Sequence, residues 1–369
     1  MRSGRKLVRG FERWVRGGRL APLGRWAWRS LQMPHRLAEM TQHVRGMDAA
    51  LGEIRGLLRA NGGGAGAPAA PLQSYPGYTE ADLALFERFA QEPPPSAAEG
   101  FITDFLGVRT RTSFVQGTEG LGGKVLGLPV PDDGWHSEAI EWIGLFKSVA
   151  GARGRLTVME LGAGWGAWSV AAAAAARVKG VSAQHLCAVE ADPGHFAFMI
   201  EHFRDNGLDP DAHRLINAAV GPKAGKARWP KVADPAADYG SRPRTASETG
   251  KSDHTGRYVA EWMEVEILPI ADLLRGEDAW DLVHIDVQGW EVDLCVAAGR
   301  LLDERVRWLV VGTHDAKLHG DLIGLMFERA WVLENEKPPR FVWAAGAPSL
   351  TAMTTHDGTQ VWRNPGLTG

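Results

Sequence analysis

Residues 158–168 read VMELGAGWGAW and decide the fold. An apolar run ends at Leu161, three alternating glycines follow, and alanine-rich sequence begins at Ala167. A glycine turn between a buried strand and a helix is where open α/β sheets bind their ligands. Two classes of ligand compete for such a turn, namely dinucleotides and S-adenosylmethionine.

Around this turn, short apolar runs alternate with segments of helix length. The pattern predicts strands over 156–161, 185–190, 213–220, 263–268, 280–287 and 306–312, and helices over 167–179, 193–206, 291–302 and 318–330. Several of the apolar runs are nearly continuous Val, Ile and Leu, which is typical of strands covered on both faces. We therefore predict an α/β fold with a Rossmann-like, doubly wound sheet. Two late pieces, 331–334 and 359–362, are expected to form an antiparallel edge.

The N-terminal 78 residues have a different character. Residues 1–36 hold ten Lys and Arg against a single acid, Glu12, and arginine recurs too often for the apolar core of a secretory signal. We therefore expect a retained basic segment and a cytoplasmic protein. Apolar residues at alternating spacings of three and four predict an amphipathic helix or coiled coil over 37–61. A Gly/Pro/Ala-rich stretch predicts a flexible linker over 62–78.

The remaining chain is expected to form a helical and β preamble at 79–150 that packs on a core domain at 151–369. A heptad seam excludes water best against a second copy, so we expect a homo-oligomer assembled through 37–61. The arginines of 1–36 are expected to add peripheral contact with an anionic membrane, whereas no nucleic-acid fold accompanies them. Cys187 and Cys295 lie in apolar runs without pairing or metal spacing, so they are expected to be buried reduced thiols. No metal site is expected.

Two acids bear on the choice of cofactor. Gly162-x-Gly164-x-x-Ala167 formally satisfies the dinucleotide fingerprint. Glu160 argues against a dinucleotide, because a carboxylate repels a pyrophosphate but suits the ammonium of an amino acid. Glu190 ends the next predicted strand, where an acid accepts hydrogen bonds from ribose hydroxyls in either class.

The series ELGAGWG, AVEADPGHF, NAAVG, LVHIDVQGWE and VVGTH, within residues 135–340, resembles the FkbM-type family of class I S-adenosylmethionine-dependent methyltransferases. The resemblance implies a sheet of the class I methyltransferase type and S-adenosyl-L-methionine as cofactor. It implies that the methionine end is held by Glu160 and the loop Gly162, Ala163, Gly164, Trp165 and Gly166. It also places Glu190 at the ribose, Ala219 near the adenine and Asp286 beside the methyl-transfer centre, and Ala191 is a further expected cofactor-binding residue. The acceptors that it suggests are hydroxyls of sugars, glycolipids, polysaccharides or secondary metabolites.

The sequence departs from the family pattern at two positions. His284 stands where the family usually has lysine, and Gln288 stands where glutamate is common. We expect this pair to be neutral at neutral pH, which weakens any acid or base role for either residue.

Asp286 and His314 are the candidates for a base that takes the acceptor's proton. Asp286 ends a buried strand at the cofactor edge, and its alternative role is to cap the following turn. His314 ends the next strand, and adjacent strand ends open into one crevice. Its alternative is a ring satisfied by Asp315 or by the backbone.

Acceptor contacts are expected from two places. His136 precedes a predicted helix, and a long Pro/Gly/Ser/Arg-rich insert over 222–262 is typical of a lid or binding loop. Within the insert we predict Asp238, Tyr239, Arg242 and Arg244 as substrate-binding residues. Two other functions remain open at this point, an NAD(P)-dependent oxidoreductase and a catalytically inactive scaffold with the methyltransferase fold.

Overall fold

A seven-stranded sheet organises the chain in the computed structural model, which describes residues 77–126, 137–244 and 250–368, all within one compact unit. Its strands are β4 (Arg155–Leu161), β5 (Ala183–Glu190), β6 (Arg214–Asn217), β10 (Trp280–Ile285), β11 (Val306–Thr313), β12 (Val332–Lys337) and β15 (Gly358–Arg363). They lie in the order β12-β15-β11-β10-β4-β5-β6. Neighbours are parallel except for the two pairs made by β15. The predicted Rossmann-like sheet, with its late antiparallel strand, is confirmed.

The strand order reverses beside β4. The chain first adds β5 and β6 on one side of β4 and then adds β10 and β11 on the other side. A crevice opens beyond the carboxyl ends of the strands at such a reversal. Glu160 of β4 is paired in register with Ala188 of β5 and with His284 of β10, so the carboxyl ends of three strands reach this crevice.

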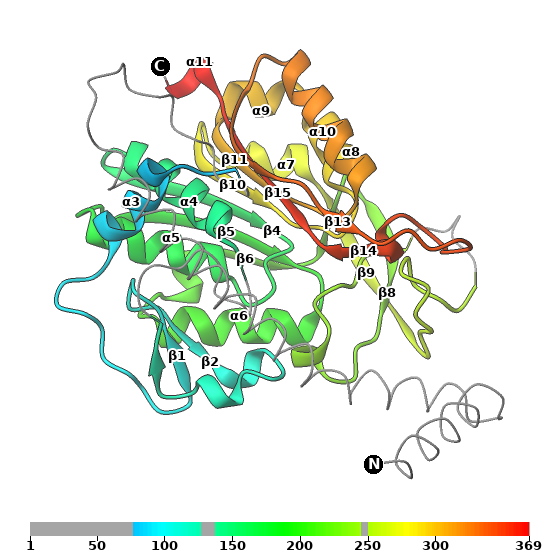
Figure 1. Ribbon diagram of the computed structural model, residues 1–369, viewed down its shortest axis with the longest axis horizontal. Helices are drawn as coiled ribbons and strands as arrows, with labels where there is room; N and C mark the ends of the chain where they lie inside the picture. Colours follow the sequence, from blue (N-terminus) through cyan, green and yellow to red (C-terminus); the bar gives the residue numbers. More distant parts are fainter. Residues whose placement is uncertain (1–76, 127–136, 245–249, 369) are drawn as a thin grey trace, which may run out of the picture. The chain divides into compact units, whose positions relative to one another are not determined.

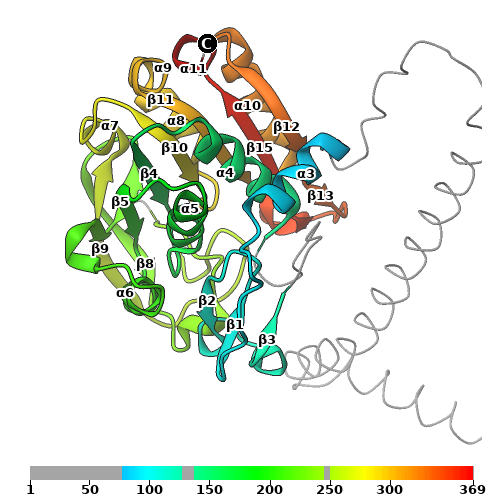
Figure 2. The same cartoon turned by 90° about the vertical axis from the view of Figure 1, so that its left-hand side faces the viewer.

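Helices cover both faces of the sheet (Figures 1 and 2). One face carries α4 (Ala139–Gly151), α5 (Ala167–Val178) and α6 (Pro193–Asp205), and the other carries α7 (Ile270–Leu274), α8 (Glu291–Ala298), α9 (Arg300–Arg305) and α10 (Ala316–Glu328). Side chains of a strand alternate between the faces, so Val158 joins one apolar core and Met159 joins the other. This double burial explains the near-continuous apolar runs.

The segment before the sheet packs on the α4 face. Helix α3 (Glu80–Phe89) begins at Glu80, because Thr79 and Asp82 cap it reciprocally. Phe89 stacks on Phe146 of α4 with ring centroids 4.6 Å apart. A small sheet of β1 (Phe101–Thr103), β2 (Arg109–Arg111) and β3 (Lys124–Val125) follows, and Arg111 of β2 pairs with Asp205 of α6.

Three predicted elements differ from the structure. The strand predicted at 263–268 exists as β9 (Trp262–Pro269), but it lies outside the main sheet, between β7 (Ala219–Gly221) and β8 (Gly225–Pro230). The run 213–220 divides at Ala218 into β6 and β7, and the helix predicted over 291–302 breaks at Gly299, which has φ 50°. The insert over 222–262 is therefore partly β-sheet.

The shorter elements are η1 (Thr112–Phe114), η2 (Glu119–Leu121), η3 (Pro210–Ala212), η4 (Pro235–Ala237), β13 (Arg340–Phe341), η5 (Thr351–Met353), β14 (Thr354–His356) and α11 (Pro365–Thr368).

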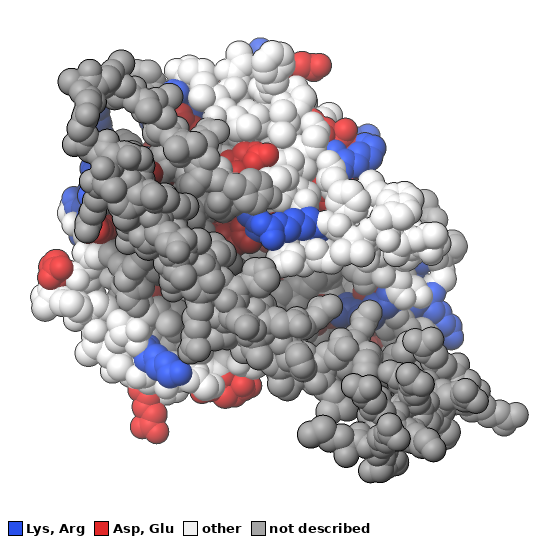
Figure 3. All heavy atoms as spheres, viewed as in Figure 1, with Lys and Arg blue, Asp and Glu red and all other residues white. Residues whose placement is uncertain are grey.

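Cys187 and Cys295 are buried free thiols, as predicted. Among the described residues, no helix has the length and apolar character needed to cross a bilayer. On the face drawn in Figure 3, the Lys and Arg side chains of the described residues that are in view form small separated groups. The predictions for 1–36, 37–61, His136 and nearly all of the linker concern residues outside those that the structure describes.

Candidate active site

The glycine turn after β4 needs its glycines for space as well as for conformation. Gly162, Gly164 and Gly166 have φ of 77°, 55° and 74°, in the left-handed region that side chains disfavour. A Cβ on Gly162 would stand 1.7 Å from the carbonyl oxygen of Asp286, so only glycine allows the ends of β4 and β10 to approach this closely. The turn is anchored to β5 as well, because the N–H groups of Gly162 and Ala163 both donate to Val189 O at 3.0 Å.

Glu160 occupies the N-terminus of α5. Its two carboxylate oxygens accept the backbone N–H groups of Trp168 at 3.1 Å and Ser169 at 2.8 Å. The residue is 1% exposed. Burial raises the pKa of Glu160, although His284 and these two amides oppose the rise. A carboxylate of this chain thus fills the place where a helix N-terminus attracts an anion.

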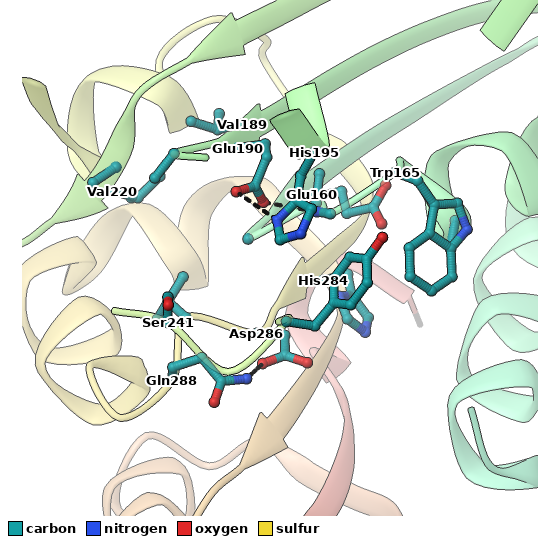
Figure 4. Close-up of a pocket in the computed structure, with 18 of the residues that line it drawn as sticks. Glu160, Trp165, Val189, Glu190, His195, Val220, Ser241, His284, Asp286 and Gln288 are labelled. Atoms are coloured by element: carbon teal, nitrogen blue, oxygen red, sulfur yellow. Dashed lines mark hydrogen bonds and ion pairs between the residues drawn. The ribbon is translucent and has the colours of Figure 1, made fainter. Parts of the chain in front are cut away.

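Glu190, at the end of β5, ties the glycine turn to the start of α6. Its Oε2 accepts the N–H of Gly164 at 2.8 Å, and its Oε1 accepts the N–H of Asp192 at 2.7 Å. His195 lies beside it, with Nδ1 3.7 Å from Oε1 (Figure 4). Burial opposes the charged ring, but Glu190 and the carbonyl of Pro235 raise the pKa of His195 above its ordinary value.

These elements enclose a cavity of about 230 Å³. Of the predicted cofactor residues, all but Gly166 line it: Glu160, Gly162, Ala163, Gly164, Trp165, Glu190, Ala191 and Ala219. Gly166 instead packs against α6, where an added Cβ would lie 3.0 Å from Met199 and Phe203. The cavity is acidic near β4 and β5 and apolar near Ala191, Val220 and Trp229. It therefore offers polar and apolar ends to one ligand.

The insert supplies one wall of the cavity through Tyr239. This ring stacks on His195 with centroids 4.1 Å apart, meets Trp165 edge-on at 5.0 Å, and donates its hydroxyl to Phe114 O at 2.6 Å. Burial, with Glu190 and two neighbouring acids, raises the pKa of Tyr239, so the phenol stays protonated. Its contacts make it a rigid wall.

The other predicted substrate residues of the insert do not line the cavity. Asp238 pairs with Arg257 at 2.6 Å. Arg244 is 8% exposed, bridges by its backbone to Arg228 of β8 and lies over the Trp262 ring. Arg242 lies near the loop after β10, with a nitrogen 3.9 Å from the Cβ that Gly289 lacks. The insert meets the cavity through Trp229, Tyr239, Ser241 and Pro243 instead.

Asp286 and His314 lie together at the acceptor side of the crevice. His314 Nε2 is 3.0 Å from Asp286 Oδ1, and His314 Nδ1 is 2.9 Å from Glu291 Oε1. Burial favours the neutral ring, yet Glu291 and Asp286 raise the pKa of His314 well above its ordinary value. Burial likewise opposes ionisation of Asp286, but the charge of His314 lowers the pKa of Asp286. An imidazolium in this position carries a proton on each nitrogen and has no lone pair with which to act as a base.

The loop after Asp286 is held in a strained form. Gln288 has φ 60°, unusual for a residue with a side chain, and its Nε2 donates to Asp286 Oδ1 at 3.1 Å. Glu291 accepts the N–H of Gly289 at 3.0 Å from both its oxygens. These bonds hold the loop and Asp286 Oδ1 in place, so they fix the orientation of the Asp286 carboxylate toward the cavity.

Asp286, Glu291 and His314 also place one ligand-type atom each within 4.8 Å of one another. The two nitrogens of His314 lie against different carboxylates, however, so the ring forms ion pairs with two acids at once. A metal ion would have to displace one of these ion pairs. The arrangement favours a buried ion triad over a metal centre.

Sequence reasoning missed several residues of the cavity wall. His195, Trp229 and Ser241 lie in it, together with Val115 and Trp168. His195 sits inside the quoted motif AVEADPGHF, but its role depends on Tyr239 and Pro235, which lie at least 40 positions further along the chain. Nothing in a local pattern reveals such a contact.

Comparison with known proteins agrees with this arrangement. Residues 160–333 match the methyltransferase FkbM domain. A protein of Jannaschia sp. (strain CCS1) named "Putative methyltransferase" is 28% identical over 274 residues, which cover 73% of this chain and 94% of that protein.

Two solved structures are more distant. The S-adenosylmethionine-dependent methyltransferase of Agrobacterium tumefaciens has 13% identity and a TM-score of 0.36, covering 61% of each chain. The methyltransferase FkbM of Methylobacillus flagellatus KT has 13% identity and a TM-score of 0.33, covering 57% of this chain and 44% of the other. These TM-scores say nothing about function. The glycine turn and most of the sheet lie within residues 160–333, the part of the chain that matches the methyltransferase FkbM domain.

Proposed function

We propose that the protein is an S-adenosylmethionine-dependent methyltransferase that methylates a hydroxyl oxygen. The observation that carries the proposal is the position of Glu160, whose carboxylate accepts the first amides of α5. In dinucleotide-binding sheets the pyrophosphate takes that position. A second anion there would face an acid at close range, which disfavours NAD(P) despite the formal fingerprint.

The residues of the cavity fit S-adenosylmethionine at both ends. Glu160 and the turn Gly162–Gly166 suit an amino-acid group, and Glu190 suits ribose hydroxyls. Ala191, Ala219 and their neighbours provide an apolar wall for adenine. When bound, S-adenosylmethionine supplies an electrophilic methyl group on a sulfonium, so the protein contributes placement and proton handling.

Asp286 is the residue that we assign to the acceptor hydroxyl. It lines the cavity, its side chain is 35% exposed, and both the ion pair with His314 and the hydrogen bond from Gln288 go to Oδ1. His314 and Gln288 hold the carboxylate ionised and oriented, and Asp286 accepts a hydrogen bond or proton from the acceptor. Base catalysis of this kind contributes about 10²- to 10⁴-fold. His314 is a positioning residue in this scheme.

The acceptor class rests on the family resemblance: a sugar, glycolipid, polysaccharide or secondary-metabolite hydroxyl. On the sequence alone, we also propose that residues 37–61 assemble copies of the chain. The arginines of 1–36 would add contact with an anionic membrane at the inner face.

Calorimetric titration with S-adenosylhomocysteine and with NADH tests the cofactor. We expect micromolar binding of S-adenosylhomocysteine and none of NADH at the same concentrations. Binding of NADH alone would replace this proposal with the oxidoreductase. Cofactor binding without methyl incorporation into any hydroxylated sugar, glycolipid or polysaccharide would favour the inactive scaffold.

Asp286→Asn is expected to lower turnover by at least about 100-fold while changing the affinity for S-adenosylhomocysteine by less than about threefold, because the amide cannot accept the acceptor's proton. Turnover is followed as transfer of labelled methyl groups, and affinity by calorimetry. Asp293→Asn, an exposed acid in the first turn of α8, is the matched control. Equal losses of turnover and affinity would make Asp286 a cofactor-positioning residue.

A further inference from the structure

A buried histidine that the scheme above does not use stands in the cavity wall. His284 is 3% exposed and lies on β10, in register with Glu160 of β4. Its Nε2 lies 3.4 Å from Glu141 Oε1 on α4. Its Nδ1 is buried and has no hydrogen-bond partner among the described residues. Buried polar atoms are rarely left unpaired, so a bound group is the natural partner of Nδ1.

The surroundings of His284 favour its charged form. Glu141 faces it from α4, Glu160 from β4, and Asp286 from the end of its own strand, while Trp168 of α5 covers the ring. Burial alone would lower the pKa of His284, but these three carboxylates raise it above its ordinary value. In its charged form the ring donates Nε2–H to Glu141 and keeps Nδ1–H as a second donor. The prediction from sequence that position 284 is neutral did not take these distant acids into account.

A buried cationic donor needs an anionic acceptor, and the cofactor offers one. We propose that His284 binds the α-carboxylate of the amino-acid end of S-adenosylmethionine, opposite the ammonium group that Glu160 faces. This inference rests on the proposed cofactor.

The spacing of the two strands supports this pairing. The amino-acid end is a zwitterion, so it brings no net charge into the cavity but requires partners of both signs. β4 and β10 are neighbours, about 4.8 Å apart as in any sheet, and in register they present the carboxyl group of Glu160 and the imidazole of His284. Glu160 and His284 thus form a two-residue clamp that binds an amino-acid group. The pair should contribute nothing to the binding of an adenosine compound without an amino-acid group.

Two ligands that differ only in this group test the proposal. S-adenosylhomocysteine and 5′-methylthioadenosine share the adenosine and the thioether, but only the first carries the amino acid. For His284→Asn we expect about 10- to 100-fold weaker binding of S-adenosylhomocysteine, the usual effect of losing a charge-assisted hydrogen bond, and less than about twofold change for methylthioadenosine. Calorimetry measures both without turnover. His356→Asn, exposed and outside the cavity wall, should change neither.

A second variant distinguishes the loss of the cation from a general loss of folding. His284→Lys keeps a cation at the same place and should recover most of the preference for S-adenosylhomocysteine. Loss of preference with Asn and recovery with Lys supports the clamp. Equal weakening of both ligands by His284→Asn, or no weakening of either, overturns it. Failure of the unsubstituted protein to bind either ligand would instead overturn the proposed cofactor.

Discussion

Gly162→Ala is expected to destabilise the protein by about 3 kcal/mol or more and to abolish cofactor binding. A residue with a side chain at φ 77° costs about 1–2 kcal/mol by itself. The larger part comes from the Cβ, which would stand 1.7 Å from the Asp286 carbonyl oxygen and force the ends of β4 and β10 apart. Glu160, His284 and Asp286 lie at those strand ends, so the cavity loses its shape along with the sheet.

Gly180→Ala is the matched control for this prediction. Gly180 has φ 82°, almost the same backbone conformation, but a Cβ there would meet no atom within 4 Å. It should therefore cost only the conformational part, about 1–2 kcal/mol, and leave binding intact. Urea unfolding gives both free energies, and calorimetry with S-adenosylhomocysteine gives the affinities. If the two variants lose equal stability, the close approach of the strand ends is not what the glycine provides.

Those parts of the fold that local sequence decides can be predicted from the sequence. The order of apolar runs and caps predicts β4, α5 and α6 within two residues or so, because each is decided by local chemistry: a buried run, an alanine stretch, and Asp192 before Pro193. The conformation of Gly162 is also predictable from the motif. Its contact with Asp286 is not, since it joins segments more than 120 positions apart.

The alternating pattern of β9 indicates a different sheet from the predicted one. Its residues alternate, with Glu264 and Glu266 exposed between partly buried neighbours, which is typical of a sheet with one solvated face. The doubly covered strands β4 and β10 have no such alternation. The period-2 pattern of 263–268 was thus a sign that this strand belongs to a different sheet.

In the candidate site, too, some residues can be predicted from local sequence and others cannot. Residues at strand ends, such as Glu160, Glu190 and Asp286, were found because every parallel strand delivers its last residue to one edge. The substrate-binding residues of the insert are predicted only from their residue types. In the structure, Arg244 lies over the Trp262 ring and Asp238 pairs with Arg257. Composition shows that an insert exists, but only the packing shows which of its side chains reach the cavity.

His314→Gln is expected to destabilise the protein by about 3 kcal/mol or more near pH 6, because it leaves Glu291, which is 0% exposed, buried without its cation. The loss should depend on pH. The neighbouring carboxylates raise the pKa of His314 in the folded protein well above its value in the unfolded chain. The stabilisation is therefore fully present below the unfolded pKa, about 6.5, and disappears as the pH rises through the folded pKa. The difference between wild type and His314→Gln should therefore shrink as the pH rises above about 6.5.

Asp286 does not disturb this test, because its pKa is lowered and its own contribution is lost only under acid conditions. Urea unfolding of both proteins across the pH range measures the difference, and His356→Gln, an exposed histidine, should stay within about 0.5 kcal/mol of wild type throughout. A difference that is constant with pH would mean that His314 contributes by packing and a neutral hydrogen bond. The ring would then have a lone pair at neutral pH, and His314 would regain its place beside Asp286 as a candidate for the base.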